Sequence, residues 1–429
     1  MKCSALKLCS GIGLSVFVAF APQLQATESE SFLIKNATLH TATAKGRLDH
    51  ADLRVANGKI QQIGVNLEPQ EGDKVFDATG KHVTPGLMNA RTQLGLVEIS
   101  AVESTNDTST EMEGMGASFN IAPAINFHST LIPQNRTNGL TRALVMPYNG
   151  NNLFAGEGAL ILLRSEKNGL IKQRAVQSAV YGSAAAGMSG GSRAAAYARL
   201  EKALSEATYV RSNLSQFKPG IKYEFSQSLD DLKALIPVLT GQVPLVIEAG
   251  RADDILNLIA LKKKFGFKLV VSGAGEAWQV AKELAEGNVP VLMDPIANIP
   301  SFDALTVRLD GAAKLYEAGV KLIFTGGGTH NAYLVRQSAG NAVANGLPHT
   351  AAIEAMTINA AEVFGVKNYG QLEPGMDADV VIWDGDPLEV TSNTYAVFIQ
   401  GERQSMVSRA TRLRDRYWQL KGSQTGYSR

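Results

Sequence analysis

The feature that most constrains the fold is a regular alternation of apolar strands and helical stretches in the middle of the chain. Strand patterns recur at 243–250, 267–275, 289–295 and 320–328. Strands that alternate with helices indicate parallel β/α units. Residues 85–366 are close in number to the roughly 250 residues typical of an eightfold barrel. We therefore predict an α/β fold with a (β/α)8 TIM barrel over this range. An open doubly wound sheet is the alternative that the pattern leaves open.

Both ends of the chain show a different pattern, in which short strands are joined by turns. Asn57 and Gly58 suit the two positive-φ positions of a type I′ turn between alternating strands. Similar strands return near the C-terminus in "DADVVIWDG" and "AVFIQGER". We expect residues 30–84 and 367–405 to form one small β-sandwich domain. Residues 406–429 are expected to form a helical tail, either solvated or bound to a partner, because charge alternates there at helical spacing.

The N-terminus has the pattern of a secretory signal. Two lysines precede the apolar run "GIGLSVFVAFA", and Ala26 offers a small residue for cleavage. We expect residues 1–26 to be a signal peptide and the protein to be periplasmic or secreted. A membrane anchor is the weaker alternative, because the run is shorter than the roughly 20 residues that span a bilayer. Cys3 and Cys9 both lie in this segment, so the processed protein would have no disulfide and no thiol ligand.

Charge and composition exclude some classes of partner. Lys and Arg number 41 against 40 Asp and Glu, which gives a formal net charge of +1. This balance gives no basic excess with which to bind nucleic acid. Once the signal is removed, no membrane-spanning segment is expected.

Two pairs of segments resemble the amidohydrolase superfamily, in particular its imidazolonepropionase- and adenine-deaminase-like members. "NGKIQQIG" followed by "VTPGLMNARTQLGL" is similar to the start of that family's barrel. "AVANGLPHTAAIEAMTINAAEVFGV" followed by "GQLEPGMDADVVIWDGDPLE" is similar to its end. The resemblance covers about residues 32–403. It implies a (β/α)8 barrel with a β-sandwich built from both chain ends. It also implies that a metal at the barrel mouth activates water to hydrolyse non-peptide C–N bonds of the cyclic amide or amidine type.

The metal ligands that the resemblance implies are substituted in this chain. A His-x-His motif is expected at the end of the first barrel strand, where Arg91 and Gln93 stand. Guanidinium has no lone pair for a metal, and an amide oxygen is a poor ligand for zinc. The histidine positions of strands five and six fall near Glu248 and Gly273, and the aspartate position of strand eight falls at Gly326. We therefore expect no divalent metal such as zinc, and interpret Arg91 as a partial replacement of its charge.

The other polar residues near these positions each have a functional and a structural interpretation. Glu248 could be a base or ligand, or could form an ion pair with Arg91. His330 could be a general base or substrate contact, or an ordinary loop histidine. The glycine-rich "TGGGTH" could bind phosphate, but it lacks the Lys-Ser/Thr of a P-loop. The residues expected to line a small-molecule site are Arg91, Gln93, Glu248, Gly273, Gly326 and His330.

Other acids and histidines are assigned to supporting positions. Glu98 and Glu157 are possible mouth residues, and are better explained as helix-cap or loop acids. The remaining histidines with an assigned place are not expected to bind metal; they are His40, His50 and His82 in the β domain and His349 at the start of a late helix.

Two classes of function follow from this sequence. In the favoured class, the protein is a catalytically degenerate amidohydrolase, or pseudoenzyme. It would bind a small ligand in the barrel mouth, or would form a homo-oligomer or a hetero-oligomer with an active amidohydrolase subunit. In the alternative class, it still hydrolyses C–N bonds at an atypical, metal-independent site that uses Glu248, Asp294 or His330.

Overall fold

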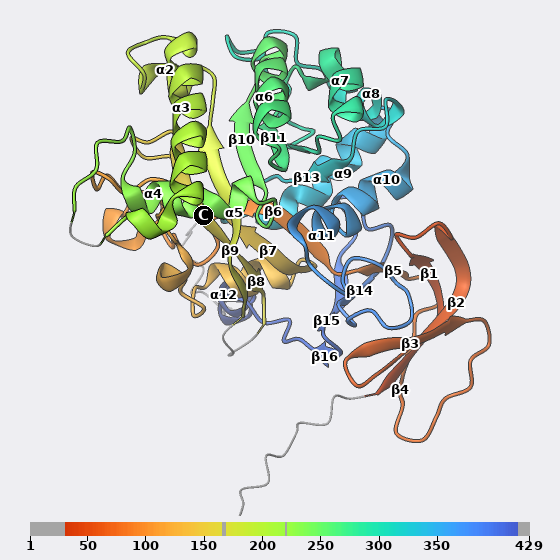
Figure 1. Ribbon diagram of the computed structural model, residues 1–429. Helices are drawn as coiled ribbons and strands as arrows, with labels where there is room; N and C mark the ends of the chain where they lie inside the picture. Colours follow the sequence, from red (N-terminus) through yellow and green to blue (C-terminus); the bar gives the residue numbers. More distant parts are fainter. Residues whose placement is uncertain (1–30, 165–168, 219–220, 419–429) are drawn as a thin grey trace, which may run out of the picture.

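The computed structural model describes residues 31–164, 169–218 and 221–418. The predicted signal peptide and the last part of the predicted tail lie outside these ranges. Over the described residues, the chain forms two eight-stranded sheets, one from both chain ends and one from the middle (Figure 1). No helix in the described ranges is long and apolar enough to cross a bilayer.

The first sheet combines strands from the two ends of the chain. Its strands are β1 (Phe32–His40), β2 (Arg47–Ala56), β3 (Lys59–Gly64), β4 (Lys74–Asp77), β5 (His82–Pro85), β14 (Val380–Trp383), β15 (Thr394–Ile399) and β16 (Glu402–Arg403). Their order is β16-β15-β14-β5-β1-β2-β3, with β4 beside β1. β5 joins the two ends because it pairs with β14, with Val83 opposite Ile382. Asn57 and Gly58 both have positive φ between β2 and β3, which confirms the predicted turn.

This sheet curls over its own hydrophobic core. Phe32 of β1 stacks on Phe398 of β15, with ring centroids 4.3 Å apart. Two strands, β5 and β14, separate β1 from β15 in the sheet, so a flat sheet could not bring these rings together. The terminal sheet is therefore continuous and folds over itself, and the predicted β-sandwich stays a prediction.

The second sheet forms the middle of the molecule. Its strands are β6 (Leu87–Thr92), β7 (Leu140–Val145), β8 (Phe154–Leu162), β9 (Leu170–Val180), β10 (Leu245–Ala249), β11 (Leu269–Gly273), β12 (Val291–Met293) and β13 (Leu322–Phe324), in sequence order. β8 runs antiparallel to both of its neighbours, and the other seven strands of this described sheet run parallel. This departs from the predicted uniform β/α repeat. The connections 146–153 and 163–169 are shorter than the dozen or so residues that a parallel crossover needs.

A buried amide links the two edge strands of this sheet. Asn89 of β6 donates from Nδ2 to the carbonyl oxygens of Gly326 (3.0 Å) and Ala332 (2.9 Å), just after β13. Thr325 Oγ1 donates to Asn89 Oδ1 at 2.8 Å. The eight strands therefore form a nearly closed barrel, in which side-chain hydrogen bonds span the seam between β6 and β13.

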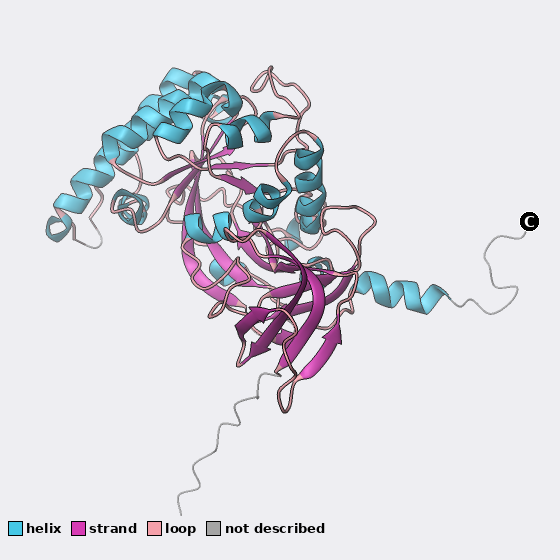
Figure 2. Ribbon diagram, turned by 90° about the vertical axis from the view of Figure 1, so that its right-hand side faces the viewer, coloured by secondary structure: helices cyan, strands magenta, loops and turns pink. Residues whose placement is uncertain are grey.

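Helices cover the outside of the barrel (Figure 2). The α-helices are α1 (Leu131–Arg136), α2 (Ser183–Gly187), α3 (Arg193–Ser212), α4 (Leu229–Ala234), α5 (Ile236–Leu239), α6 (Ala252–Phe265), α7 (Ala281–Glu286), α8 (Gly311–Glu317), α9 (Val335–Ala344), α10 (His349–Ala355), α11 (Ile358–Phe364) and α12 (Arg409–Trp418). Short 3-10 turns occur at Glu103–Thr105, Ala122–Ala124, Leu214–Gln216, Ala277–Val280 and Ala332–Leu334.

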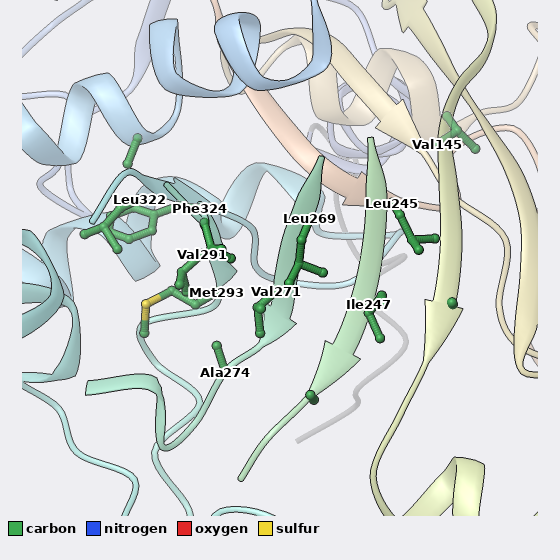
Figure 3. Close-up of a cluster of buried hydrophobic side chains, with 14 of the residues drawn as sticks. Val145, Leu245, Ile247, Leu269, Val271, Ala274, Val291, Met293, Leu322 and Phe324 are labelled. Carbon is green, nitrogen blue, oxygen red and sulfur yellow. The ribbon is translucent and has the colours of Figure 1, made fainter. Parts of the chain in front are cut away.

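Alternate strand residues pack on opposite sides of the barrel wall, as the strand period requires. Ile247 and Val271 belong to the cluster shown in Figure 3, which also contains Leu258 of α6. Their neighbours Val246 and Val270 belong to a second cluster with Phe364 of α11 and the corresponding residues of β12 and β13. Glu248 and Ser272 follow Val246 and Val270 by two residues, so their side chains point to the barrel interior.

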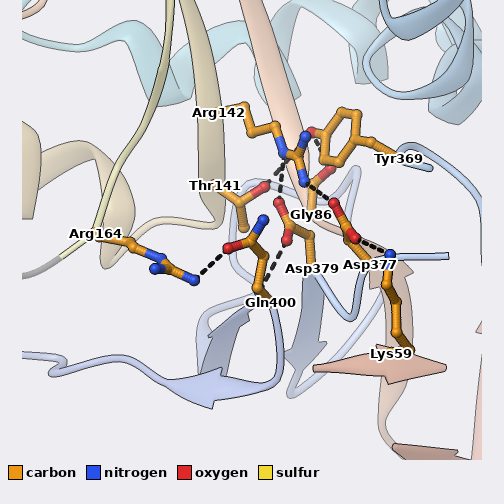
Figure 4. A network of polar contacts seen from close by, with 9 residues as sticks. All are labelled: Lys59, Gly86, Thr141, Arg142, Arg164, Tyr369, Asp377, Asp379 and Gln400. Carbon is orange, nitrogen blue, oxygen red and sulfur yellow. Dashed lines mark hydrogen bonds and ion pairs between the residues drawn. The ribbon is translucent and has the colours of Figure 1, made fainter. Parts of the chain in front are cut away.

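A buried charge network joins the barrel to the terminal sheet (Figure 4). Arg142 of β7 donates from Nε to Asp379 Oδ2 and from Nη2 to Asp377 Oδ2, both at 2.8 Å. Its guanidinium lies 4.2 Å from the ring centroid of Tyr369. Lys59 of β3 also pairs with Asp377, at 2.5 Å. Arg142 thus links the barrel to residues immediately before β14 and, through Asp377, to the N-terminal strands.

Arg142→Leu is expected to destabilise the fold by about 3–5 kcal/mol, because Asp377 and Asp379 both lose their shared cation and Asp379 is fully buried. Chemical unfolding measures this change. Arg47→Leu is the control, because Arg47 pairs with Asp49 on the surface and both side chains are 54% exposed. It should cost at most about 1 kcal/mol. Equal losses in the two variants would show that the Arg142 network does not stabilise the fold.

Three histidines that lie far apart in the sequence meet where the terminal sheet contacts α10. His40 Nε2 lies 2.9 Å from His82 Nδ1, and the ring of His40 stacks on that of His349 at 5.0 Å. His349 Nε2 lies 3.0 Å from Asp386 Oδ1. Burial, followed by the charges of His349 and His82, lowers the pKa of His40 to about 3.

Because the pKa of His40 falls from 6.5 to about 3 on folding, the folded state binds fewer protons between these values. Stability should therefore fall as the pH drops below 6.5, by about 2 kcal/mol between pH 7 and pH 5. Unfolding free energies at the two pH values should show a smaller loss for His40→Gln than for the wild type. His128→Gln, at an exposed histidine, should behave as wild type. An unchanged pH dependence in His40→Gln would refute this assignment.

Candidate functional site

Arg91 reaches the barrel mouth because β6 is irregular at its end. Asn89 pairs with Ala143, and Thr92 pairs with Val145. An advance of three residues along β6 therefore corresponds to an advance of two residues along β7. Such bulges re-aim side chains. Arg91 donates from Nη2 to Glu248 Oε2 at 2.5 Å and from Nη1 to Ser272 Oγ at 2.9 Å. Side chains from β6, β10 and β11 thus converge on one ion pair.

This ion pair lies at the end of the barrel where catalytic residues are usually found. Glu248 and Ser272 are register partners near the C-terminal ends of β10 and β11. Active sites of such barrels are built at the C-terminal ends of the strands. The Arg91 and Glu248 side chains are 26% and 46% exposed, so water reaches both. The cavity that they line has a volume of about 10 Å³, which holds about one water molecule.

The residues at this mouth do not fit a divalent metal. Tetrahedral zinc sites use at least three protein ligands. Glu248 supplies one carboxylate and Ser272 one hydroxyl, while Arg91 places a cation against both. Across the described part of the chain, no group of three or more His, Cys, Asp or Glu side chains is arranged to hold a metal ion.

The glycines at two expected ligand positions are required by the backbone and its packing. A Cβ at Gly326 would lie 2.6 Å from Ser338 Oγ and 3.3 Å from Val335 Cα. Gly273 has a φ of +80°, which disfavours residues with a side chain. The carbonyl oxygen of Gly326 already accepts a hydrogen bond from Asn89. A side chain at Gly326 would therefore have to displace Ser338, and one at Gly273 would adopt a strained backbone conformation.

Gln93 and His330 bind the loops around the mouth and are not part of the ion pair. Gln93 is buried, and its Oε1 accepts a 2.6 Å hydrogen bond from Thr329 Oγ1. His330 Nε2 lies 3.0 Å from the carbonyl oxygen of Glu98. Both residues thus tie the segment after β13 to the segment after β6. Their predicted roles in ligand binding or catalysis stay predictions.

The two other acids considered from the sequence have structural partners. Glu98 accepts hydrogen bonds from Ser129 Oγ (2.6 Å) and Thr130 N (3.1 Å) at the start of α1, as expected of a helix-cap acid. Glu157 of β8 pairs with Arg174 Nε at 2.9 Å, and burial raises its pKa to about 7. Neither carboxylate contacts Arg91 among the described interactions.

Sequence reasoning missed two residues of the mouth, Ser272 and Asn89. Ser272 is the one polar residue in "LVVSG" and follows the inward-facing Val270 by two positions. Asn89 precedes Arg91 by two positions and accepts a 3.1 Å hydrogen bond from the Arg91 amide. For Ser272, the period of two along the strand was the available signal.

A long loop after β12, residues 294–310, exposes large apolar side chains at the same end of the barrel. Ile299, Phe302 and Leu305 are 86%, 94% and 61% exposed. Charged groups of the loop are paired: Asp303 pairs with Arg193 of α3, and Arg308 pairs with Asp310 within the loop at 2.6 Å. The loop is therefore anchored by its charges and presents its apolar residues to solvent. Clustered exposure of this kind is typical of protein interaction sites.

Comparison with known sequences supports a relationship to amidohydrolases. A profile of the "Amidohydrolase family" matches residues 291–408. The "Amidohydrolase tasK" of Hapsidospora irregularis is 23% identical over 395 residues, which cover 82% of this chain and 40% of that protein. A "Dihydroorotase" of Lactobacillus acidophilus is 51% identical over 57 residues, 13% of this chain and 12% of that protein. The chain thus spans less than half the length of these curated relatives.

Solved structures extend the similarity to almost the whole fold. An amidohydrolase from Thermotoga maritima superposes with a TM-score of 0.76 and 25% identity, and the match covers 87% of this chain and 99% of that one. A molinate hydrolase shares the fold at a TM-score of 0.55 and 15% identity, with 88% and 95% covered. Together with the profile match, this similarity supports membership of the amidohydrolase superfamily.

Proposed function

We propose that this protein is a non-catalytic member of the superfamily, and that it acts through binding at the barrel mouth. The observation that carries this proposal is the Arg91–Glu248 ion pair, in which Arg91 also donates a hydrogen bond to Ser272. The cavity beside this ion pair has a volume of only about 10 Å³. We further propose that the nearly closed barrel is a (β/α)8 TIM barrel in which antiparallel β8 replaces one β/α unit. Seven parallel strands in sequence order support this.

Electrostatics support the loss of metal chemistry. A divalent ion a few ångströms from the Arg91 guanidinium would be repelled by several kcal/mol at an intermediate dielectric. The carboxylate of Glu248, which could otherwise bind the ion, is already held by that guanidinium. The same positive charge balances Glu248 without an ion. We therefore propose that Arg91 takes over part of the metal's electrostatic role and none of its water activation.

The partner that we propose is another polypeptide, an amidohydrolase subunit that retains its metal site. Ligand pockets for small molecules usually measure about 300–1,000 Å³, far more than the space beside Arg91. A carboxylate-bearing small molecule would compete with Glu248 for the Arg91 guanidinium. The exposed Ile299, Phe302 and Leu305 instead offer a surface for a protein. In tasK, the region similar to this chain is 40% of the polypeptide, so it is part of a longer chain there.

The competing proposal, an atypical hydrolase, finds less support in the contacts of its candidate residues. Glu248 is paired with Arg91, and His330 lies against the carbonyl oxygen of Glu98. Asp294 Oδ1 accepts a hydrogen bond from Ile296 N at 3.2 Å, within its own loop. These contacts do not assemble a nucleophile, a base and an oxyanion site in one place.

Activity assays distinguish the two proposals. The purified protein should hydrolyse cyclic amides and acyl-amino acids no faster than Glu248→Gln and His330→Ala, because neither residue is expected to activate water. Product formation is followed by chromatography. Turnover by the wild type that either substitution abolishes would establish the atypical hydrolase and contradict the non-catalytic assignment.

The proposed partner contact can be tested at the most exposed apolar residue of the mouth. Phe302→Ser should weaken co-purification with an amidohydrolase subunit that retains its metal-binding histidines by about tenfold or more, as expected for a central aromatic contact. Val65→Ser is the matched control, because Val65 is 65% exposed but lies in the terminal sheet region, just after β3. Unchanged binding by Phe302→Ser would exclude this loop as the interface.

A further inference from the structure

The C-terminal helix α12 projects from the body of the molecule (Figure 2). None of its ten residues is buried. Isolated helices of this length are marginal in water, so α12 lacks the packing that normally stabilises such a helix. One side of α12 lines a cavity of about 750 Å³ against the body, and Thr411 and Arg414 are among its lining residues. The other sides face solvent.

The free sides of α12 are amphipathic. Arg409, Arg412 and Arg416 recur at intervals of three and four residues and so share one side. Leu413 and Tyr417 are four residues apart on the neighbouring side and are 40% and 55% exposed. Next to Tyr417, Trp418 is 80% exposed. An arginine stripe beside exposed Leu and Tyr, with an exposed Trp at the end of the helix, is typical of helices that lie in a membrane interface.

The charge on α12 is not balanced locally. The helix holds four arginines and one aspartate, a formal charge of +3, whereas the whole chain has only +1. Arg414 pairs with Asp415 at 2.7 Å. Within the described ranges, no carboxylate pairs with the arginine stripe. A surface complementary to α12 must therefore supply negative charge together with an apolar layer.

We propose that α12 docks on an anionic phospholipid bilayer. The arginine stripe would contact lipid phosphates, while Leu413, Tyr417 and Trp418 would enter the boundary between headgroups and acyl chains. An acidic groove on a protein could match the arginines, but it is the less favoured occupant because it need not accept a terminal Trp and Tyr together. The proposal is independent of the proposed function, because it concerns neither the barrel mouth nor its partner.

Vesicle binding tests the proposal with the full chain. Wild type should co-sediment with vesicles of phosphatidylglycerol and phosphatidylcholine in equal parts, and more weakly with phosphatidylcholine alone. Arg409→Glu/Arg412→Glu/Arg416→Glu should lower the affinity for the anionic vesicles by about tenfold or more. The control carries the same charge change at exposed lysines elsewhere, Lys45→Glu/Lys222→Glu/Lys263→Glu, and should keep most of the binding.

Fluorescence identifies the segment that enters the lipid. Anionic vesicles should shift the tryptophan emission to the blue, and Trp418→Phe should abolish that shift while retaining binding. The apolar N-terminal run carries no tryptophan, so it cannot produce the signal. The proposal is overturned if wild type does not bind the anionic vesicles, if both triple variants lose binding equally, or if the blue shift persists in Trp418→Phe.

Discussion

The guanidinium of Arg142 connects parts of the chain that are more than two hundred residues apart. It contacts Asp377, Asp379 and Tyr369 from a barrel strand, and both carboxylates belong to the segment that leads into the terminal sheet. Burial of these charges is tolerable only because each has a partner. Since β14 pairs with β5, which runs directly into β6, the same network fixes where the first barrel strand begins. The position of the barrel mouth therefore depends on this contact.

At the mouth, an internal ion pair lies where the resemblance to amidohydrolases would place a metal centre. Arg91 is aimed inward by the irregular end of β6 and is held by Glu248 and Ser272. The position at Gly326 fits this arrangement, because a Cβ there would lie 2.6 Å from Ser338 Oγ and the Gly326 carbonyl oxygen accepts a hydrogen bond from Asn89. Restoring one ligand would leave both the cation and the backbone packing in place. These contacts agree with the proposal that the fold is kept while the metal centre is lost.

The sequence predicted much of this fold because strand and helix periods are local properties. It also gave Arg91 and Glu248 as candidates and raised their pairing as one interpretation, which the structure shows. The antiparallel β8 was missed because apolar runs do not reveal strand direction. Asn89 was missed because its partners, such as Gly326, lie far away along the chain. The meeting of His40 with other histidines was not foreseen either, since it depends on how the terminal sheet packs against α10.

The metal content of the purified protein tests the proposed loss of the metal centre most directly. The chain is incubated with zinc, manganese and iron in turn, freed of loosely bound ions by gel filtration, and analysed by mass spectrometry for metal per chain. Arg91 and its ion pair predict that no ion is retained in stoichiometric amount. About one tightly bound ion per chain, lost on Glu248→Gln, would place a working metal centre at the mouth and contradict the account.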